Sequence, residues 1–213
     1  MTYKYVSIRD ICNELVSGAT PNCNRFTLSK KKLPNYVTFL GGGSTTKDGS
    51  FNANSNKYCS KEAAQSLKRT ELEEGDTLIT IVGASVGNTC LVPKEFLPAY
   101  SNQNVAVLKA NENLITKKFL NYAMRSIGGE SIRKNINQQA QPSVNLKQVS
   151  QIRIPLPPLP EQGKITEILS GIDNLLNQLT LKIQLLYFLR KALFQRISSI
   201  SSDSEKVKFG EII

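Results

Sequence analysis

Large aliphatic side chains recur at every seventh position in the C-terminal part of the sequence. Six successive positions share this property, and they are Ile165, Ile172, Leu179, Leu186, Leu193 and Ile200. The residues three and four places further on are mostly apolar too, and no proline occurs from Glu161 to Ile200. A heptad pattern thickened on one side predicts one long helix that packs against at least one other helix.

The apolar stripe of this helix needs a partner. About 38 residues at a rise of 1.5 Å each give a rod of roughly 55–60 Å, and the sequence offers no second helix-like pattern of equal length. We expect the partner in another chain or in a portion outside this sequence; a helix folded back on its own domain is the alternative. The expected contact residues are Ile165, Ile168, Leu169, Ile172, Leu175, Leu176, Leu179, Ile183, Leu186, Leu189, Leu193, Ile197 and Ile200.

The sequence before the helix alternates short β-like runs with turns. Two runs rich in Ile, Val, Leu and Thr lie within Asp76–Val92 and flank a turn at Gly83–Asn88, which predicts a hairpin. Asn104–Ala110 has the composition of another strand, and Thr116–Ile127 has apolar residues at helical spacing behind a threonine cap. The chain is therefore predicted to be an α+β protein, in which a mixed α/β domain with an irregular, mostly antiparallel sheet precedes one long helix.

Four prolines within six residues precede the predicted helix, and they are Pro155, Pro157, Pro158 and Pro160. Proline fixes φ and lacks an amide hydrogen, so "PLPPLP" forms a short, stiff and extended segment. Pro160 is tolerated in the first turn of a helix, and Glu161 places a negative charge at the helix N-terminus. We therefore expect this junction to fix the direction in which the helix leaves the domain.

These patterns divide the sequence into four segments. The last residues, "EKVKFGEII", resemble the opening "YKYVSIRDIC", which suggests that a second copy of the first domain begins at the end of the chain. The predicted segments are a globular domain at 1–155, a proline-rich junction at 156–160, the long helix at 161–200, and a linker with the start of a possible second repeat at 201–213.

The excess of positive charge lies mainly in the first domain. The formal net charge is +10. Residues 1–150 hold 19 Lys and Arg against 11 Asp and Glu, whereas residues 151–213 hold 8 against 6. A polyanionic partner such as nucleic acid would therefore dock on the first domain; solubility alone is the other interpretation.

The residue content argues against several kinds of chemistry. The sequence contains no histidine, which removes the commonest general base and most catalytic zinc sites. The four cysteines are spaced 11, 36 and 31 residues apart, which is no zinc pattern. Because the sequence starts without a signal peptide and has no apolar run long enough to span a membrane, we expect reduced thiols and a cytoplasmic protein.

Several stretches together resemble one known family. The segment "IRIPLPPLPEQGKITEILSGIDNLLNQL", followed by the heptad helix, closely resembles the conserved region of the DNA-specificity (S) subunits of Type I restriction–modification enzymes. The stretches "SGATP", "GDTLITIVGASVGNTCLV", "SNQNVAVLK" and "QPSVNLKQVSQIRIPLPPLPEQ" are similar to the frame of that family's target recognition domain. The loops between them, especially Arg25–Ser55, match nothing identifiable, as expected where the choice of DNA sequence varies.

The resemblance implies a non-catalytic subunit that binds double-stranded DNA. Such subunits usually carry two recognition domains separated by two long antiparallel helices, and each domain reads one half of a split target. The helices also seat methyltransferase subunits, and restriction subunits join that core. This sequence departs from the pattern because it holds one domain and one helix. It resembles a half-subunit, whose helix would pair with a second copy as an antiparallel coiled coil.

Two groups of polar residues suit DNA contact, since Lys and Arg bind phosphates while Asn, Gln, Ser and Thr also reach base edges. The first group comes from "RFTLSKKK" and "GGGSTTKDGS", and the second from "RKNINQQAQ". A solvated lysine surface and a polar loop are the respective alternatives. The candidate residues are Arg25, Lys30, Lys31, Lys32, Ser44, Thr45, Thr46, Lys47, Arg133, Lys134, Asn137, Gln138 and Gln139.

The sequence lacks the motifs of an autonomous enzyme. Neither glycine-rich loop fits the spacing of a phosphate-binding P-loop. No Asn-Pro-Pro-Tyr-type amino-methyltransferase motif occurs, and no cluster of carboxylates with a lysine resembles a nuclease site. We therefore expect no catalytic residue, no metal and no cofactor. A helical scaffold whose basic domain binds something other than specific DNA remains the alternative function.

Overall fold

The computed structural model describes residues 3–20, 27–134 and 142–210, with side chains as far as residue 199. The chain divides into two compact units, Met1–Thr166 and Glu167–Ile213. We call the first unit the head and the helical part of the second, residues 167–210, the rod. Helix α6 (Leu159–Gly210) begins in the head and makes up the rod.

Four antiparallel strands form the main sheet of the head, in the order β2-β8-β5-β6. Strand β8 is completely buried from Val105 to Leu108, as its uninterrupted apolar sequence predicts. The hairpin predicted within Asp76–Val92 is confirmed, because two of these strands pair across the turn. The strands are β2 (Cys12–Ser17), β5 (Thr77–Thr80), β6 (Thr89–Leu91) and β8 (Val105–Ala110).

Two smaller sheets complete the β structure. A three-stranded sheet has the order β4-β3-β7, in which β3 pairs antiparallel with β4 and parallel with β7. A two-stranded antiparallel ladder joins β1 to β9. The prediction of an irregular, mostly antiparallel sheet is therefore confirmed. The strands are β1 (Tyr5–Ser7), β3 (Tyr36–Leu40), β4 (Lys57–Ser60), β7 (Ala99–Ser101) and β9 (Arg153–Pro155).

The helix predicted at Thr116–Ile127 begins at Lys117, and Thr116 is its N-cap as predicted. Thr116 Oγ1 accepts a hydrogen bond from the amide of Phe119 at 3.2 Å. α3 (Lys117–Ala123) continues through a π-helical turn, Met124–Gly128, into α4 (Gly129–Lys134). The two glycines, 128 and 129, therefore do not interrupt the helical backbone.

The remaining helices of the head are short. Two of them are capped by side chains that accept from the backbone, α2 by Ser60 and α5 by Asn145. The short helices are α1 (Ile8–Ile11), α2 (Lys61–Gln65) and α5 (Leu146–Ser150), with single 3₁₀ turns at Gly42–Ser44, Ala53–Ser55, Lys68–Thr70 and Lys94–Phe96.

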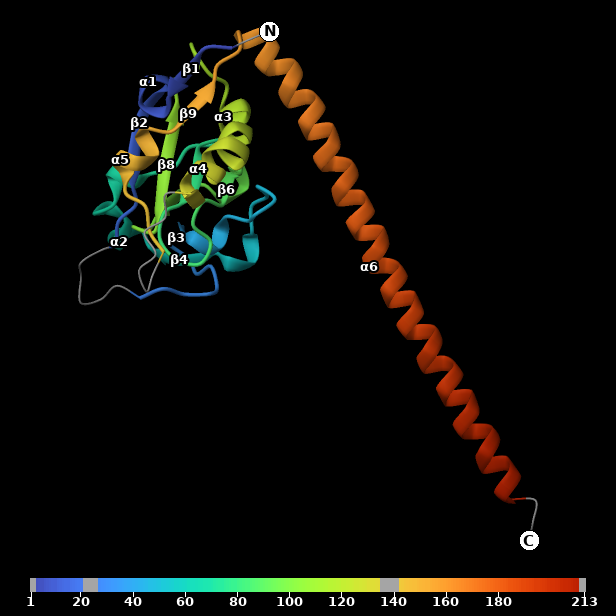
Figure 1. The fold of residues 1–213 in the computed structure, drawn as a ribbon. Helices are drawn as coiled ribbons and strands as arrows, with labels where there is room; N and C mark the ends of the chain where they lie inside the picture. Colours follow the sequence, from blue (N-terminus) through green and yellow to red (C-terminus); the bar gives the residue numbers. More distant parts are fainter. Residues whose placement is uncertain (1–2, 21–26, 135–141, 211–213) are drawn as a thin grey trace. The chain divides into compact units, whose positions relative to one another are not determined.

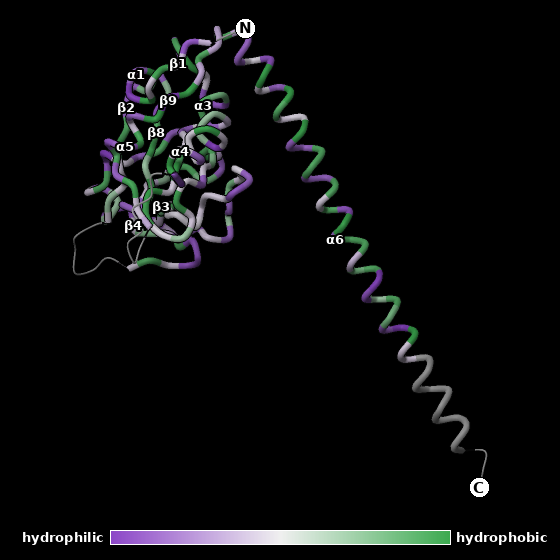
Figure 2. Tube along the Cα trace, viewed as in Figure 1, coloured by the Kyte–Doolittle hydropathy of each residue, from purple (hydrophilic) through white to green (hydrophobic). Residues whose placement is uncertain are grey.

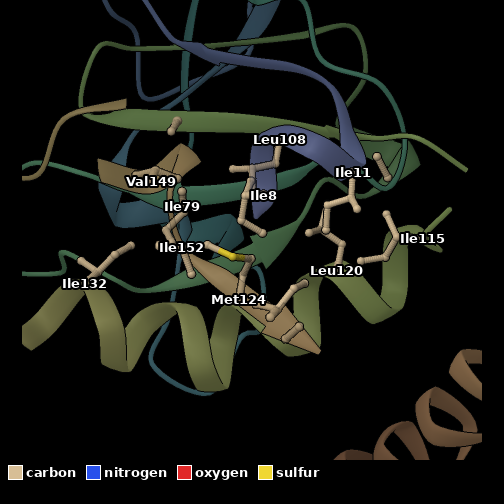
Figure 3. Close-up of a cluster of buried hydrophobic side chains, with 14 of the residues drawn as sticks. Ile8, Ile11, Ile79, Leu108, Ile115, Leu120, Met124, Ile132, Val149 and Ile152 are labelled. Carbon is tan, nitrogen blue, oxygen red and sulfur yellow. The ribbon is translucent and has the colours of Figure 1, made fainter. Parts of the chain in front are cut away.

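The main core lies between the four-stranded sheet and the helical segment α3–α4 (Figure 3). Leu120 and Met124 from the helical segment point toward Ile79 of β5 and Leu108 of β8, and all four are fully buried. Burial of each such side chain stabilises the fold by about 1.5–3 kcal/mol. The helical segment therefore covers one face of the sheet.

A buried glutamine ties the first turn of α6 to the head. Gln162 is fully buried, and its Oε1 accepts from the amide of Thr116 at 2.9 Å. Its Nε2 donates to the carbonyl oxygens of Leu114 and Pro157, both at 2.9 Å. Three hydrogen bonds therefore fix the first turn of the helix beside the proline-rich segment, a contact that the sequence analysis did not foresee.

Helix α6 is longer than the segment predicted as helical. It begins at Leu159, inside the predicted junction, and continues past Ile200 to Gly210, through part of the segment predicted as a linker. Figure 2 shows hydrophobic residues recurring along the helix as far as its side chains are described. The division of the chain into functional domains stays a prediction.

The buried carboxyl of Asp76 gives a pH test of the head. Asp76 is 1% exposed, and burial raises its pKa, although the carboxyl accepts from the amide of Glu73 at 2.8 Å. A raised folded-state pKa means that stability is lost as pH rises above the ordinary carboxyl range. We expect Asp76→Asn to gain stability relative to the wild type between pH 4 and pH 7.5, by about 1.4 kcal/mol for each unit of the shift.

Urea denaturation of both proteins at the two pH values measures this difference. The asparagine of the variant keeps an oxygen that can accept the Glu73 amide, so the comparison isolates the charge. A stability difference that does not change with pH would contradict the assignment.

Candidate nucleic-acid interface

The first predicted group of DNA-contacting residues lies at the end of the head that carries β3 and β4. In Figure 1 this end is opposite the end formed by β1, β9 and the start of α6. Lys30, Lys31 and Lys32 are exposed there. Ser29 pairs with Tyr58 of β4 through two backbone hydrogen bonds of 2.9 Å, which fixes the start of the lysine run beside the sheet. Arg25, predicted with them, lies outside the described residues.

Two predicted members of the glycine loop turn inward. Ser44 is fully buried and its Oγ accepts from the amide of Gly41 at 3.4 Å. Thr45 is 4% exposed, and its hydroxyl lies 2.7 Å from that of Thr80 and 3.0 Å from the carbonyl of Gly42. These hydroxyls brace the loop from within, so we leave both residues out of the proposed DNA contacts.

The other two members of this loop lie nearer the surface. Thr46 is half-buried, and its hydroxyl donates to the Asp48 carboxylate and to the carbonyl of Ser50. The Thr46 hydrogen bond is the main reason that the pKa of Asp48 is lowered, so this carboxylate stays ionised. Lys47 is exposed next to it. The glycine loop therefore exposes one negative charge, on Asp48, and one positive charge, on Lys47. Of its predicted DNA-contacting residues, Lys47 is the best placed to contact a phosphate.

A hollow of about 500 Å³ opens between the lysine run and the glycine loop. Two lysines line it, Lys30 and Lys57, and none of its described lining residues carries a carboxylate. Three asparagines, 54, 56 and 102, supply paired donors and acceptors. The sequence analysis predicted Lys30 but missed Lys57 and the asparagines, although "NANSNK" holds three asparagines within five residues.

The second predicted group falls on and after α4. Arg133 and Lys134 are exposed at the end of this helix, and Lys134 pairs with Glu130 at 3.2 Å, one turn earlier. The Arg133 guanidinium lies against Gly87, where a Cβ would come within 3.5 Å of its Nη1. Asn137, Gln138 and Gln139 lie outside the described residues.

The turn between β5 and β6 brings the two groups close to one another. Gly87, with φ of +87°, packs so closely on α4 that a Cβ would lie 3.2 Å from the carbonyl of Gly129. Two residues before Gly87, Ser85 Oγ donates to the carbonyl of Gly42 at 3.3 Å. The glycine loop and Arg133 thus border the same turn. This turn connects two strands, as expected for a structural turn rather than a P-loop.

The apolar stripe predicted on the long helix is exposed along the rod. Leu179 is 54% exposed and Leu186 65%. Ile165 differs, because it is half-buried against the core of the head, so we leave it out of the proposed partner stripe. The side chain of Ile200 lies outside the described ones. Those exposed are Ile168, Ile172, Leu175, Leu176, Leu179, Ile183, Leu186, Leu189, Leu193 and Ile197, with Leu169 half-buried.

A second apolar surface lies on the other side of the rod. Leu181, Leu185 and Phe188 are spaced four and three residues apart and are 59–72% exposed. At about 100° per residue, this surface lies roughly 150° around the helix from the heptad stripe. The heptad positions alone do not predict this surface. The heptad stripe and this second apolar surface therefore offer apolar contacts to two different neighbouring molecules.

The described part of the chain offers neither a cluster of metal ligands nor a membrane-spanning helix. Its histidine, cysteine, aspartate and glutamate residues form no group of three able to hold a metal ion. None of its helices is long and apolar enough to cross a membrane. Burial raises the pKa of the Cys12 and Cys90 thiols to about 12, which leaves both poor nucleophiles.

Comparison with known proteins gives a consistent result. The family model of the Type I restriction modification DNA specificity domain matches residues 1–187. A provisionally named type I restriction enzyme MjaX specificity subunit of Methanocaldococcus jannaschii is 27% identical over 196 residues, or 89% of this chain and 44% of that protein. The EcoR124I/EcoR124II specificity subunit of Escherichia coli is 26% identical over 168 residues, or 76% of this chain and 39% of that protein.

Solved structures share the fold. The HsdS subunit from Thermoanaerobacter tengcongensis superimposes with a TM-score of 0.61 at 20% identity, covering 83% of this chain and 43% of that one. This chain spans less than half the length of these relatives.

Proposed function

The chain belongs to the family of Type I restriction modification DNA specificity domains, and from that membership we propose that it recognises one half of a split DNA target. The observation that carries the proposal is the match over residues 1–187, which includes the whole head and more than half of α6. The basic loops of the head support it. In this proposal residues 1–155 form the target recognition domain, 156–160 its junction and 161–200 the assembly helix.

The head would bind DNA with the end that carries β3, β4 and the glycine loop. Exposed lysines 30–32 and 47 would contact phosphates, and Arg133 would extend the contact past the turn at Gly83–Asn88. Phosphate contacts set affinity and register, while side chains that reach base edges set the sequence. Asn137, Gln138 and Gln139 stay predicted contacts. Because duplex DNA is the target, we place the protein in the cytoplasm.

The rod would set the distance between two heads. The chain matches 44% of the MjaX subunit and 43% of the HsdS chain, and in this proposal a second copy supplies the other head. Antiparallel pairing through the exposed heptad stripe gives two-fold symmetry and therefore a palindromic split target. The 52 residues of α6 correspond to about 78 Å at 1.5 Å per residue. The hydrogen bonds of Gln162 would fix the point at which α6 leaves the head, and so one end of this distance.

The two apolar surfaces of the rod support two kinds of partner. The heptad stripe suits a second copy of the helix, and the surface at Leu181, Leu185 and Phe188 would seat a methyltransferase subunit, which restriction subunits would join. A further structure with the same fold, at a TM-score of 0.62 and 21% identity, concerns complex assembly in the type I R-M system. In such an assembly this chain supplies specificity, and its partners supply methylation and cleavage.

Charge reversal of the lysines tests whether the head binds DNA. The replacement of Lys30, Lys31, Lys32 and Lys47 by glutamate is expected to weaken duplex binding by roughly a hundredfold or more at about 0.1 M salt. Each lost phosphate contact also lowers the slope of log affinity against log salt by about one. A mobility-shift titration over several salt concentrations, with and without a methyltransferase subunit, measures both effects.

The matched control reverses the same number of charges elsewhere on the chain, at four exposed lysines: Lys4, Lys118, Lys147 and Lys164. We expect this control to retain most of the affinity. A helical scaffold that does not read DNA would show equal binding by both variants, or no preference among DNA sequences in the wild type.

A further inference from the structure

A short turn in the wall of the hollow is held in place by polar side chains at its ends. The 3₁₀ turn Ala53–Ser55 lies against the glycine loop, where Asn52 Nδ2 donates to the carbonyl of Gly43 at 3.1 Å. Asn52 Oδ1 accepts from the backbone amide of Asn54 at 3.2 Å, and Ser55 Oγ donates to the carbonyl of Asn52 at 2.9 Å. A Cβ at Gly43 would lie 3.1 Å from Ser55 Cβ, so glycine lets the two segments lie this close. The turn is therefore fixed by the fold before any ligand binds.

The side chain of Asn54 takes no part in holding this turn. Asn54 is exposed and lines the hollow, whereas Asn56 is buried and Asn102 is half-buried. The backbone amide of Asn54 is hydrogen-bonded, but its side-chain amide makes no hydrogen bond to another described residue. Asn52 and Ser55, its neighbours on the turn, both use their side chains as braces. Asn54 therefore offers a ligand a free donor and a free acceptor from a rigid support.

The surroundings of Asn54 suit a polyanion. Lys30 and Lys57 are exposed and line the same hollow, and none of its described lining residues carries a carboxylate. Ammonium groups bind phosphates of any sequence, because every nucleotide carries the same phosphate. A free amide beside them can distinguish one base from another, since it donates and accepts side by side. The hollow thus combines two groups suited to the DNA backbone with one suited to a base edge.

We infer that Asn54 reads an adenine in the half-site, an inference that rests on the proposed function. An asparagine amide pairs with adenine through two hydrogen bonds, donating to N7 and accepting from N6. Guanine presents two acceptors on the same edge and would leave the amide oxygen unpaired. A phosphate would leave that oxygen unpaired too, so phosphates belong with Lys30 and Lys57.

Selection from a randomised duplex library tests the inference with the full chain, alone and with a methyltransferase subunit. Asn54→Ala is expected to lose discrimination at one base pair of the half-site by about tenfold or more, while the other positions keep theirs. The matched control is Asn113→Ala, since Asn113 is exposed and does not line the hollow. Lys57→Ala should instead weaken binding to all sequences and reduce the salt dependence.

A modified base identifies the atom that Asn54 contacts. Replacement of the read adenine by 7-deazaadenine removes N7 and keeps Watson–Crick pairing. The wild type should lose about five- to tenfold in affinity for this duplex, and Asn54→Ala should lose nothing further. Equal losses in the two proteins would overturn the contact.

The stability of the free protein separates reading from a structural role. Asn54→Ala should unfold at the same urea midpoint as the wild type, because the Asn54 side chain is exposed and makes no hydrogen bond within the described head. Asn52→Ala should unfold at a lower midpoint, since its amide braces the turn. A lower midpoint for Asn54→Ala together with lost discrimination would assign Asn54 to the fold and overturn the inference.

The selection also separates this inference from the proposed function. If the wild type selects a sequence and Asn54→Ala selects the same one with equal discrimination, the inference fails and the proposed function stands. If the wild type selects nothing, either alone or with the methyltransferase subunit, the proposed function itself fails.

Discussion

Replacement of Leu179 and Leu186 by aspartate is expected to turn a self-associating chain into a monomer. Both side chains lie in the exposed heptad stripe of the rod, at 54% and 65% exposure. An antiparallel pair would bury two such leucines from each chain, at about 2 kcal/mol per side chain. The aspartates would in addition bring charges into an apolar seam. The loss of about 8 kcal/mol would raise the dissociation constant by a factor on the order of 10⁶.

Sedimentation equilibrium at tens of micromolar measures the effect. The matched control is Asn177→Asp with Gln184→Asp, which adds the same charges with the same spacing of seven residues on the side of the rod away from the heptad stripe. This control should associate as the wild type does. A wild type that is monomeric under these conditions, or a leucine variant that still associates, would contradict pairing through this stripe.

The long helix could be predicted from the sequence because its signal is local and repeated. A heptad pattern over about 40 residues with no proline specifies a helix without any knowledge of the rest of the fold. Its ends were predicted less well. Pro160 and Leu159 are compatible with a first turn, so the helix begins before Glu161, and beyond Ile200 the polar residues lack the heptad signal while the backbone stays helical.

The strand pattern was informative where the strands are buried on both sides. β8 and the β5–β6 hairpin were predicted because uninterrupted Val, Ile, Leu and Thr mark fully buried strands. β2 was not predicted, since the adjacent polar residues Asn13 and Glu14, both exposed, interrupt the apolar pattern of "CNELVS". The parallel pairing of β3 with β7 could not be predicted either, because it joins segments that lie far apart in the sequence.

The site residues show the limits of composition as a guide. Lysines 30–32 are exposed, since ammonium groups avoid burial, and their contact with DNA stays a prediction. Serine and threonine carry no such preference, and Ser44 and Thr45 turned out to be buried. Asn56 has the opposite character, because it is buried yet unpaired among the described residues. Only the packing of the glycine loop against Ser55 and Thr80 distinguishes Ser44 and Thr45 from the exposed lysines.

Gln162 explains why the proline-rich segment stands directly before the helix. The prolines, which donate no amide hydrogen bonds, leave the carbonyl of Pro157 to the glutamine, whose Oε1 and Nε2 also pair with Thr116 and Leu114. We expect Gln162→Ala to lower the free energy of unfolding of the head by about 3 kcal/mol, because three backbone groups lose their hydrogen bonds to a fully buried side chain. Urea denaturation measures this, with Gln178→Ala on the exposed rod as a neutral control for helix propensity.

The two hydrogen bonds that the Gln162 amide donates can be tested separately from the one it accepts. Gln162→Glu keeps an oxygen for the Thr116 amide, yet a carboxylate would face the carbonyl oxygens of Leu114 and Pro157. Burial and these oxygens would raise the folded-state pKa of the new carboxyl, so the variant should approach wild-type stability near about pH 4 and lose stability as pH rises. The protonated acid can donate to one carbonyl, whereas the carboxylate can donate to neither. A deficit that is equal at acidic and at mildly alkaline pH would mean that these donated hydrogen bonds do not hold the first turn of α6.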